Sequence, residues 1–279
     1  MGNCRWRGGV VGLAGYFISF SSSFAQGILY APDHQPSAWN INQKPAVWDI
    51  NLAIGAAMVP TFHGSDRYRA TPIPLVVIRW RDTVSLGDDG LNLYWHNSKL
   101  RIGGGVSYDG GRLDHETDGI LSGGDDRLRG LGNIDASVGI RGFVSYMMGP
   151  VYFDTSAIKY IGPQNKGIVV NLSASSPLAL NKHFIVRPHL GLTWVDDNYM
   201  QTFFGVTSRQ ASQSMFHQFN GSGGLEDVNG GLTLVWLLNR HWFLGADASA
   251  TEFLGPAGRS PITISNTNAT VAAVIGYHF

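Results

Sequence analysis

The residues that could carry out chemistry are few and scattered in this sequence. None of its nine histidines lies in a metal-binding spacing such as His-Glu-x-x-His, and the one cysteine, Cys4, is far from most of them. The acidic pairs at 88–89, 125–126 and 196–197 fall in stretches expected to be turns or loops, where solvated turn residues are commoner than Ca²⁺ ligands. We therefore expect neither a metal nor another cofactor.

Two further patterns resemble catalytic motifs without their surroundings. Gly103-Gly104-Gly105 lacks the lysine and the following helix of a phosphate loop, so the glycines indicate close packing within a strand. A lipid hydrolase would need a serine and a histidine with an acid nearby. His241 and His278 lie near expected strand ends, but no serine pairs convincingly with either. We expect no enzymatic activity and keep an outer-membrane lipid hydrolase as the third candidate.

The charged residues lie mostly on strand-like segments. From Trp48 onwards, apolar residues alternate with small or polar ones, the pattern of strands with one apolar face that often ends in Trp or Tyr. The polar face carries both acids and bases, which suits a wet barrel interior better than a dry sandwich core. We predict that these charges face a lumen: Asp49, Arg79, Arg81, Arg101, Asp135, Arg141, Arg187, His189, Asp227 and Asp247. Their mixed sign favours a salt-bridged, nearly closed interior over an ion-selective pore.

Composition agrees with a barrel that crosses a membrane with strands. Charged residues make up only 14% of the 279 residues, against about 25% in ordinary soluble domains, and 36 residues are glycine. Beyond the N-terminal region no apolar run has the ~20 residues of a spanning helix. The fold predicted is therefore an all-β transmembrane antiparallel β-barrel.

The N-terminus has the pattern of a secretory signal. Arg5 and Arg7 precede an apolar run at 10–20, and small residues follow, which predicts cleavage between Ala25 and Gln26. Cleavage would leave 18 basic residues of the original 20 against 20 acidic ones, so no nucleic acid partner is expected. The predicted organisation is a signal peptide at 1–25, a proline-containing periplasmic lead-in at 26–46, and a barrel at 47–279.

The last segment, 268–279, is the expected closing strand. It alternates in period two and ends on Tyr277-His278-Phe279, which resembles the assembly signal that barrel-insertion machinery reads in the bacterial outer membrane. With this end in the periplasm, short turns and long loops alternate as in bacterial barrels. The count reaches twelve strands if 81–96 forms two short strands around Gly87–Gly90; ten or fourteen remain open.

The chain resembles the MipA/OmpV family of MltA-interacting outer-membrane proteins. The similarity covers roughly Trp48 to Phe279 and is carried by Gly64-Ser65-Asp66, Phe204-Gly205-Val206-Thr207 with Gln210-Ala211, Leu225-Glu226-Asp227-Val228, Ser260-Pro261-Ile262 and Tyr277-x-Phe279. Ser208-Arg209 stands where the family usually has Pro-Glu, so no binding role is assigned to that loop. The resemblance implies an outer-membrane barrel without known enzymatic activity, of which some members are scaffolds between a murein hydrolase and a murein synthase.

These observations lead to one principal hypothesis and one main rival. We expect a non-enzymatic barrel of the cell outer membrane, surrounded by lipids, that serves cell-wall maintenance or surface interaction as a scaffold. The alternative is a narrow porin-like channel for small solutes. The sequence does not choose a partner.

Overall fold

The computed structural model describes residues 47–279 except 88, 118–122 and 163–165. The predicted signal peptide with its Ala25–Gln26 cleavage site, and the predicted lead-in, lie outside the described residues.

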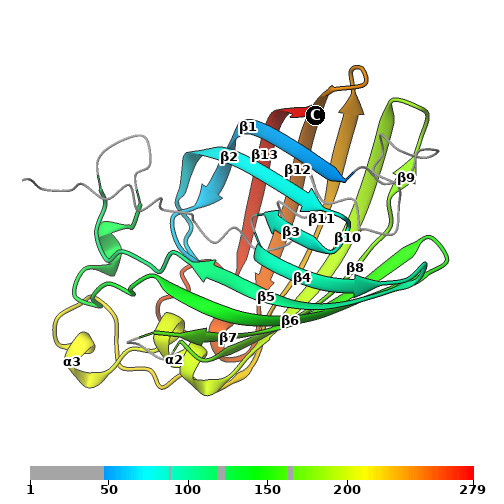
Figure 1. Cartoon of the computed structure of the whole chain (residues 1–279). Helices are drawn as coiled ribbons and strands as arrows, with labels where there is room; N and C mark the ends of the chain where they lie inside the picture. Colours follow the sequence, from blue (N-terminus) through cyan, green and yellow to red (C-terminus); the bar gives the residue numbers. More distant parts are fainter. Residues whose placement is uncertain (1–46, 88, 118–122, 163–165) are drawn as a thin grey trace, which may run out of the picture.

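The described chain folds into a single antiparallel sheet whose two ends meet (Figure 1). β1 pairs with both β2 and β13, and β11 pairs with both β10 and β12, so the sheet closes into a barrel. The strands are β1 (Trp48–Pro60), β2 (Tyr68–Trp80), β3 (Val84–Gly87), β4 (Gly90–His96), β5 (Leu100–Asp109), β6 (Ser137–Met148), β7 (Val151–Ile161), β8 (Ile168–Ser175), β9 (Leu178–Ala179), β10 (Phe184–Val195), β11 (Gly224–Leu237), β12 (Trp242–Phe253) and β13 (Thr267–His278).

The wall has twelve strand positions. β8 and the two-residue β9 pair with successive parts of β10, so β9 continues β8 beyond Pro177 and occupies the same position. The region 81–96 forms the two short strands β3 and β4, as the count of twelve required. The prediction of a twelve-stranded barrel is therefore confirmed.

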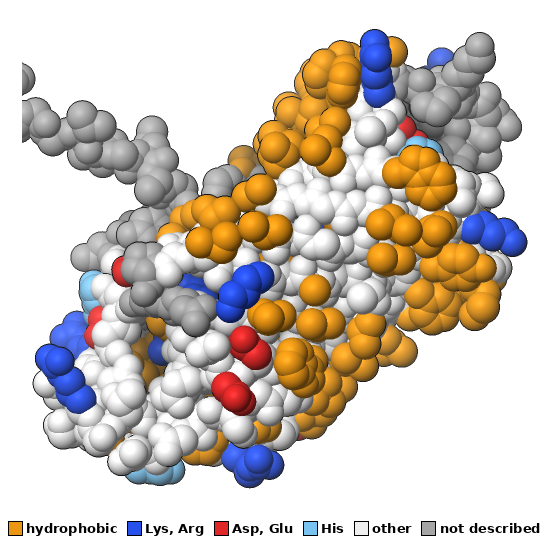
Figure 2. All heavy atoms as spheres, turned by 60° about the horizontal axis from the view of Figure 1, so that its bottom comes forward, with side chains coloured by type: hydrophobic (Ala, Val, Ile, Leu, Met, Phe, Trp, Pro, Cys, Tyr) orange, Lys and Arg blue, Asp and Glu red, His pale blue; other side chains and the backbone are white. Residues whose placement is uncertain are grey.

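The outer surface of the wall is apolar. Large hydrophobic residues that alternate along the strands are exposed, among them Ile54, Leu93, Ile140 and Leu190 with 60–69% exposure. Figure 2 shows such side chains in broad patches over the strands. Exposed aromatic residues mark both edges of this belt, as in membrane barrels: Trp48, Trp80, Trp95, Tyr146, Trp236 and Trp242 at the end with short turns, and Tyr68, Tyr108 and Trp194 at the end with long loops. We call the latter the outer end, following the usual orientation.

The inner surface is only partly polar, whereas the alternation predicted small or polar side chains there. Inward positions on one side of the barrel form a continuous apolar cluster: Ala53, Ala57, Val59, Ile73, Leu75, Val77, Leu237, Phe243, Ala272 and Val274. Close packing there depends on small residues, since a Cβ on Gly276 would lie 2.0 Å from Cζ of Phe243. Alternation therefore predicted which side chains face inward, but not that many of them form one apolar cluster.

The outer loops contain short helices that the sequence pattern did not reveal. These are η1 (Asp126–Leu128), α2 (Asp197–Phe204), α3 (Ser208–Ala211) and α4 (Gly255–Gly258). Asp125 is the N-cap of η1, and its carboxylate accepts from the Arg127 N–H. Asp196 is the N-cap of α2, and its carboxylate accepts from the Tyr199 N–H. Asp125 is fully buried rather than a solvated turn residue. Within the described ranges, no helix is long and apolar enough to cross a membrane.

Candidate functional site

Most of the predicted lumen charges lie inside the barrel. Seven of them are at most 9% exposed: Arg79, Arg101, Arg141, Arg187, His189, Asp227 and Asp247. Asp49 lies beside Arg79. Arg81 and Asp135 are placed differently, because both are exposed and precede or follow a strand rather than lie within one. The Arg81 guanidinium lies 5.0 Å from the ring centroid of Trp80, on the belt side of the wall.

Two ion pairs lie inside the barrel. Arg79 Nη1 lies 3.3 Å from Asp49 Oδ2, and Arg141 Nη1 lies 2.6 Å from Asp89 Oδ2. Asp247 accepts a hydrogen bond of 2.7 Å from the Thr233 hydroxyl. Sequence reasoning missed Asp89 as a partner because the Gly-Asp-Asp-Gly pattern indicates a turn and says nothing about where its carboxylates point.

Two of the arginines make cation–π contacts with aromatic rings. The Arg101 guanidinium carbon lies 3.7 Å from the ring centroid of Tyr94 and 4.9 Å from that of Phe143. Arg141 approaches the same Phe143 ring at 4.8 Å. Such contacts orient a guanidinium while they replace part of its hydration. These inward arginines are therefore fixed elements of the wall.

The loops at the outer end form an ordered structure, which we call the outer-mouth cap. It consists of the described parts of the loops 61–67, 110–136, 196–223 and 254–266. It has its own apolar core, with Leu128, Val206 and Ile262 at 0% exposure. The side of α2 that faces the barrel adds Met200 and Phe204, also at 0%, against Phe253 of β12. Buried side chains at this density characterise a folded lid rather than solvated loops.

A polar cluster fastens two of these loops together. Arg127 donates to both carboxylate oxygens of Asp125 (3.2 and 3.0 Å) and to the Ser65 hydroxyl (2.7 Å), and it also pairs with Asp66. The Thr61 hydroxyl donates to Asp125 at 2.7 Å. We call Thr61, Ser65, Asp66, Asp125 and Arg127 the Arg127 lock. Burial alone would raise the pKa of Asp125, but hydrogen bonds from Arg127 and Thr61 lower it to about 2.

Further contacts join the loops at the outer end to one another and join the loop after β7 to the end of β5. Arg112 donates to the backbone oxygen of Phe203 at 2.6 Å, and its burial lowers the pKa of Arg112 to about 10. Lys166 Nζ lies 2.5 Å from Asp109 Oδ1 at the end of β5, with both side chains buried. Ser260 donates to the backbone oxygen of Phe204 at 2.6 Å. The loops of the cap are thus held to one another at several points.

The geometry offers little for catalysis. Within the described ranges, no three His, Cys, Asp or Glu side chains come together as metal ligands would. His278 Nδ1 lies 3.0 Å from Asn51 Oδ1, and His241 Nδ1 lies 3.0 Å from the His278 backbone oxygen. His278 Nδ1 also lies 3.5 Å from Asp49 Oδ1, so both histidines have structural contacts at the barrel seam.

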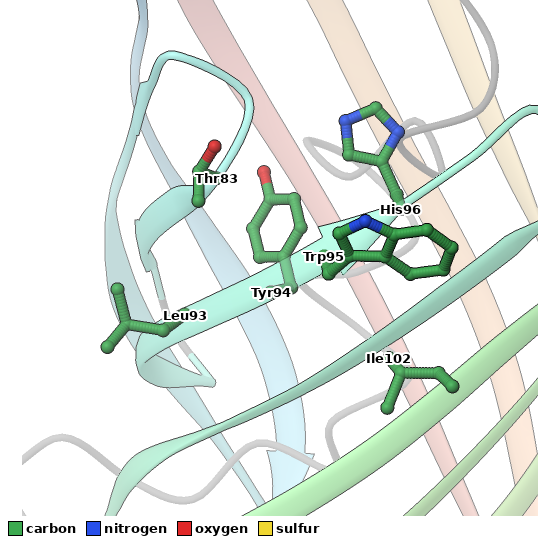
Figure 3. Close-up of a pocket in the computed structure, with 6 residues that line it drawn as sticks. All are labelled: Thr83, Leu93, Tyr94, Trp95, His96 and Ile102. Carbon is green, nitrogen blue, oxygen red and sulfur yellow. The ribbon is translucent and has the colours of Figure 1, made fainter.

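One open groove of about 470 Å³ lies near the inner end of β4 (Figure 3). Its lining is Thr83, Leu93, Tyr94, Trp95, His96 and Ile102. Beside it, Asp82 accepts from the Tyr94 hydroxyl at 3.3 Å and lies 3.0 Å from His96 Nε2. Arg81 and Asp82 have φ of 49° and 50°, uncommon for residues other than glycine, so these contacts hold a strained turn.

Residues 52–279 match the family model described as MltA-interacting protein MipA. The chain belongs to this family. The resemblance seen in the sequence is thereby confirmed, and the closed barrel with its apolar belt makes this MipA-family protein an outer-membrane protein. No curated protein matches the chain.

Solved structures of outer-membrane proteins resemble this MipA-family chain in fold. OmpT of Vibrio cholerae is 6% identical, with a TM-score of 0.41, and the match covers 85% of this chain and 99% of that one. The NanC porin is 7% identical, with a TM-score of 0.42, and the match covers 82% of this chain and 98% of that one. A bacterial polysaccharide outer membrane secretin is 9% identical, with a TM-score of 0.44, and the match covers 85% of this chain and 100% of that one. Identities this low concern the fold alone.

Proposed function

We propose that this protein is a shut, non-enzymatic scaffold of the outer membrane that holds a murein-modifying enzyme at its periplasmic end. The observation that carries this proposal is the outer-mouth cap, because a fully buried apolar core and a buried ion cluster over the mouth suit a closed barrel. The family description names an interaction with MltA, which supports a murein enzyme as the partner.

The periplasmic turns offer a docking surface with several exposed basic residues. Four of the hairpin turns at this end each present an exposed basic residue: Arg81, Lys99, Lys182 and Arg240. We call these four residues the basic rim. Such a surface suits an acidic patch on a periplasmic partner, since complementary charge steers and orients association.

Capture of a murein enzyme from detergent extracts tests the scaffold. We expect the triple variant Lys99→Gln, Lys182→Gln, Arg240→Gln to bind the captured enzyme about tenfold more weakly, since exposed charge pairs each contribute up to about 1 kcal/mol. The matched control changes three exposed basic residues of the cap, Arg129→Gln, Arg209→Gln and Arg259→Gln. Equal capture by both triple variants would remove the basic rim from the proposal, and no capture by the wild type would remove the scaffold.

A narrow channel is the second candidate, and the inward charges favour it. Arg79, Arg101, Arg141 and Arg187 face the interior from four different strands, which would suit a small anionic solute. Each is held by an acid or by aromatic rings in the described structure, or lies among other charged groups, which argues for a structural role. Single-channel recording separates the two candidates.

The C-terminal aromatics are expected to serve assembly rather than partner binding. Tyr277 lies edge-on to Trp242 at 5.1 Å and to Phe279 at 4.8 Å, and Phe279 is 63% exposed on the belt side. We expect Phe279→Ala to lower the amount of folded protein in the outer membrane without lowering export. Fractionation with heat-modifiable gel migration measures both, with Ile264→Ala, an exposed cap residue, as the control. Normal barrel yield from Phe279→Ala would contradict the assembly role.

A further inference from the structure

The barrel wall has a gap in strand pairing that lies in its outer part. β3 and β4 are short, and Figure 1 shows them between the much longer β2 and β5. β3 pairs with β2 only at Ile78–Trp80, and β4 pairs with β5 only up to Val106. Among the described residues, Tyr68–Val77 of β2 therefore has no strand partner on this side. At ~3.3 Å per residue, this unpaired edge is about 33 Å long.

The cap closes the upper end of this gap. The Arg127 lock joins the loop after β1 to the loop after β5, which are the two loops above the missing strands. Arg69 Nη1 also reaches the backbone oxygen of Gly124 at 3.3 Å. We call the region bounded by β2, β5, Gly87, Gly90 and the Arg127 lock the lateral window.

The unpaired edge of β2 is built to tolerate lipid. The β1–β2 ladder is continuous from Trp48↔Trp80 to Pro60↔Tyr68, so Pro72 and Pro74, which have no N–H, fit only if their nitrogens face away from β1. That direction is toward the lateral window. Fewer free donors lower the cost of exposing the edge to hydrocarbon, and they disfavour addition of another strand.

Apolar residues lie on both sides of this edge. Val76 faces outward and is 47% exposed in the belt, as is Val106 across the window at 48%. Ile73 and Leu75 face inward from the same part of β2 and belong to the apolar cluster of the inner wall. The lateral window thus joins the lipid belt to the apolar cluster of the inner wall.

We propose that the lateral window is a lipid site, in which an acyl chain of an outer-leaflet lipid lies across the unpaired edge of β2 and reaches Leu75. The bilayer borders the window, because exposed belt residues flank it. A strand from a second copy is the rival occupant, and the prolines oppose it. Lipid in the window also explains how the wall remains sealed where two strands are short.

Fluorescence quenching from the bilayer tests this directly. Cys4 is the only cysteine, so with Cys4→Ser a bimane label can be placed on single cysteines: Leu75→Cys at the window, Val76→Cys on the belt, and Val274→Cys as the matched control. Leu75 and Val274 belong to the same inner cluster and are 5% and 4% exposed, but β13 has strand partners on both sides. Ile73→Cys and Ala272→Cys form a second such pair in case labelling disturbs the first. Heat-modifiable migration confirms that each variant folds.

In vesicles whose lipids carry a nitroxide on the acyl chain, we expect bimane at Leu75 to be quenched as strongly as bimane at Val76. Bimane at Val274 should stay unquenched. Quenching at Val76 alone would overturn the proposal, and so would equal quenching at Leu75 and Val274, since lipid would then enter by another route. A disulfide between the thiols of two Val76→Cys chains in the vesicles would identify a second copy, rather than lipid, as the occupant of the window.

Discussion

Arg127→Ala is expected to open the outer-mouth cap. The substitution removes the guanidinium that joins Asp66 and Ser65 of one loop to Asp125 of another, and it leaves the buried Asp125 carboxylate with Thr61 as its remaining side-chain donor in the lock. Removing one partner of a buried ion pair costs about 3 kcal/mol, because the other charge stays desolvated. That cost falls on the contact between two loops, so the cap should separate while the barrel remains folded.

Limited proteolysis in detergent measures this opening through cleavage within 110–136. Arg129→Ala is the matched control, since Arg129 pairs with Asp126 at 3.0 Å but both side chains are largely exposed, at 67% and 46%. Exposed pairs contribute at most about 1 kcal/mol, so the control should be cleaved nearly as slowly as the wild type. Equal cleavage of the two variants would show that the Arg127 lock does not hold the cap.

The same lock predicts a response to acid. Since the pKa of Asp125 is lowered to about 2 from its ordinary value of 3.8, the carboxylate stabilises the closed cap fully above that ordinary value. The stabilisation is lost as the pH falls through about 2. Protease resistance of the cap, assayed with an acid-active protease, should therefore be constant down to about pH 4 and decline below it. Resistance that declines already near pH 6 would assign the switch to another group.

Arg141→Met should weaken the barrel wall itself. Arg141 of β6 holds Asp89 at 2.6 Å and also donates to Asn92 at 3.3 Å, so one side chain anchors the β3–β4 hairpin from inside. The Arg141 and Asp89 side chains are 9% and 4% exposed, and the lone carboxylate would cost about 3 kcal/mol. The expected result is a lower temperature for the shift from folded to unfolded migration on a gel.

A double-mutant cycle with Asp89→Asn separates this pair from general damage. Each single substitution leaves one buried charge unpaired, whereas the double variant leaves none. The double variant should therefore lose less stability than the sum of the two single losses. Additive losses would mean that Arg141 acts through its other contacts, Asn92 and the Phe143 ring.

The wall was predictable because a strand repeats every two residues and the barrel imposes different solvents on its two faces. Alternation placed Ile54 and Ile140 on the lipid side and Arg79, Arg187 and Asp247 inside, where the structure has them. Parity of short turns and long loops also required two strands within 81–96. These are local rules, and each segment could be judged by itself.

The cap and the apolar cluster of the inner wall were not predictable, since both depend on contacts between distant segments. The sequence indicates only a solvated turn residue at Asp125, because its contacts with Thr61 and Arg127 form in the folded chain. α2 has eight residues, too few for a helical period to stand out in a polar loop. That Ile73 and Leu75 lie beside an unpaired edge was not predictable either, because nothing in the sequence says how far β3 and β4 extend beside them.

Planar-bilayer recording of the purified wild-type protein at neutral pH tests the central claim, a barrel shut by its cap. We predict a silent bilayer, with discrete current steps only after Arg127→Ala or at a pH low enough to protonate Asp125. Regular conductance steps from the wild type at neutral pH would contradict a closed scaffold and establish the narrow channel instead.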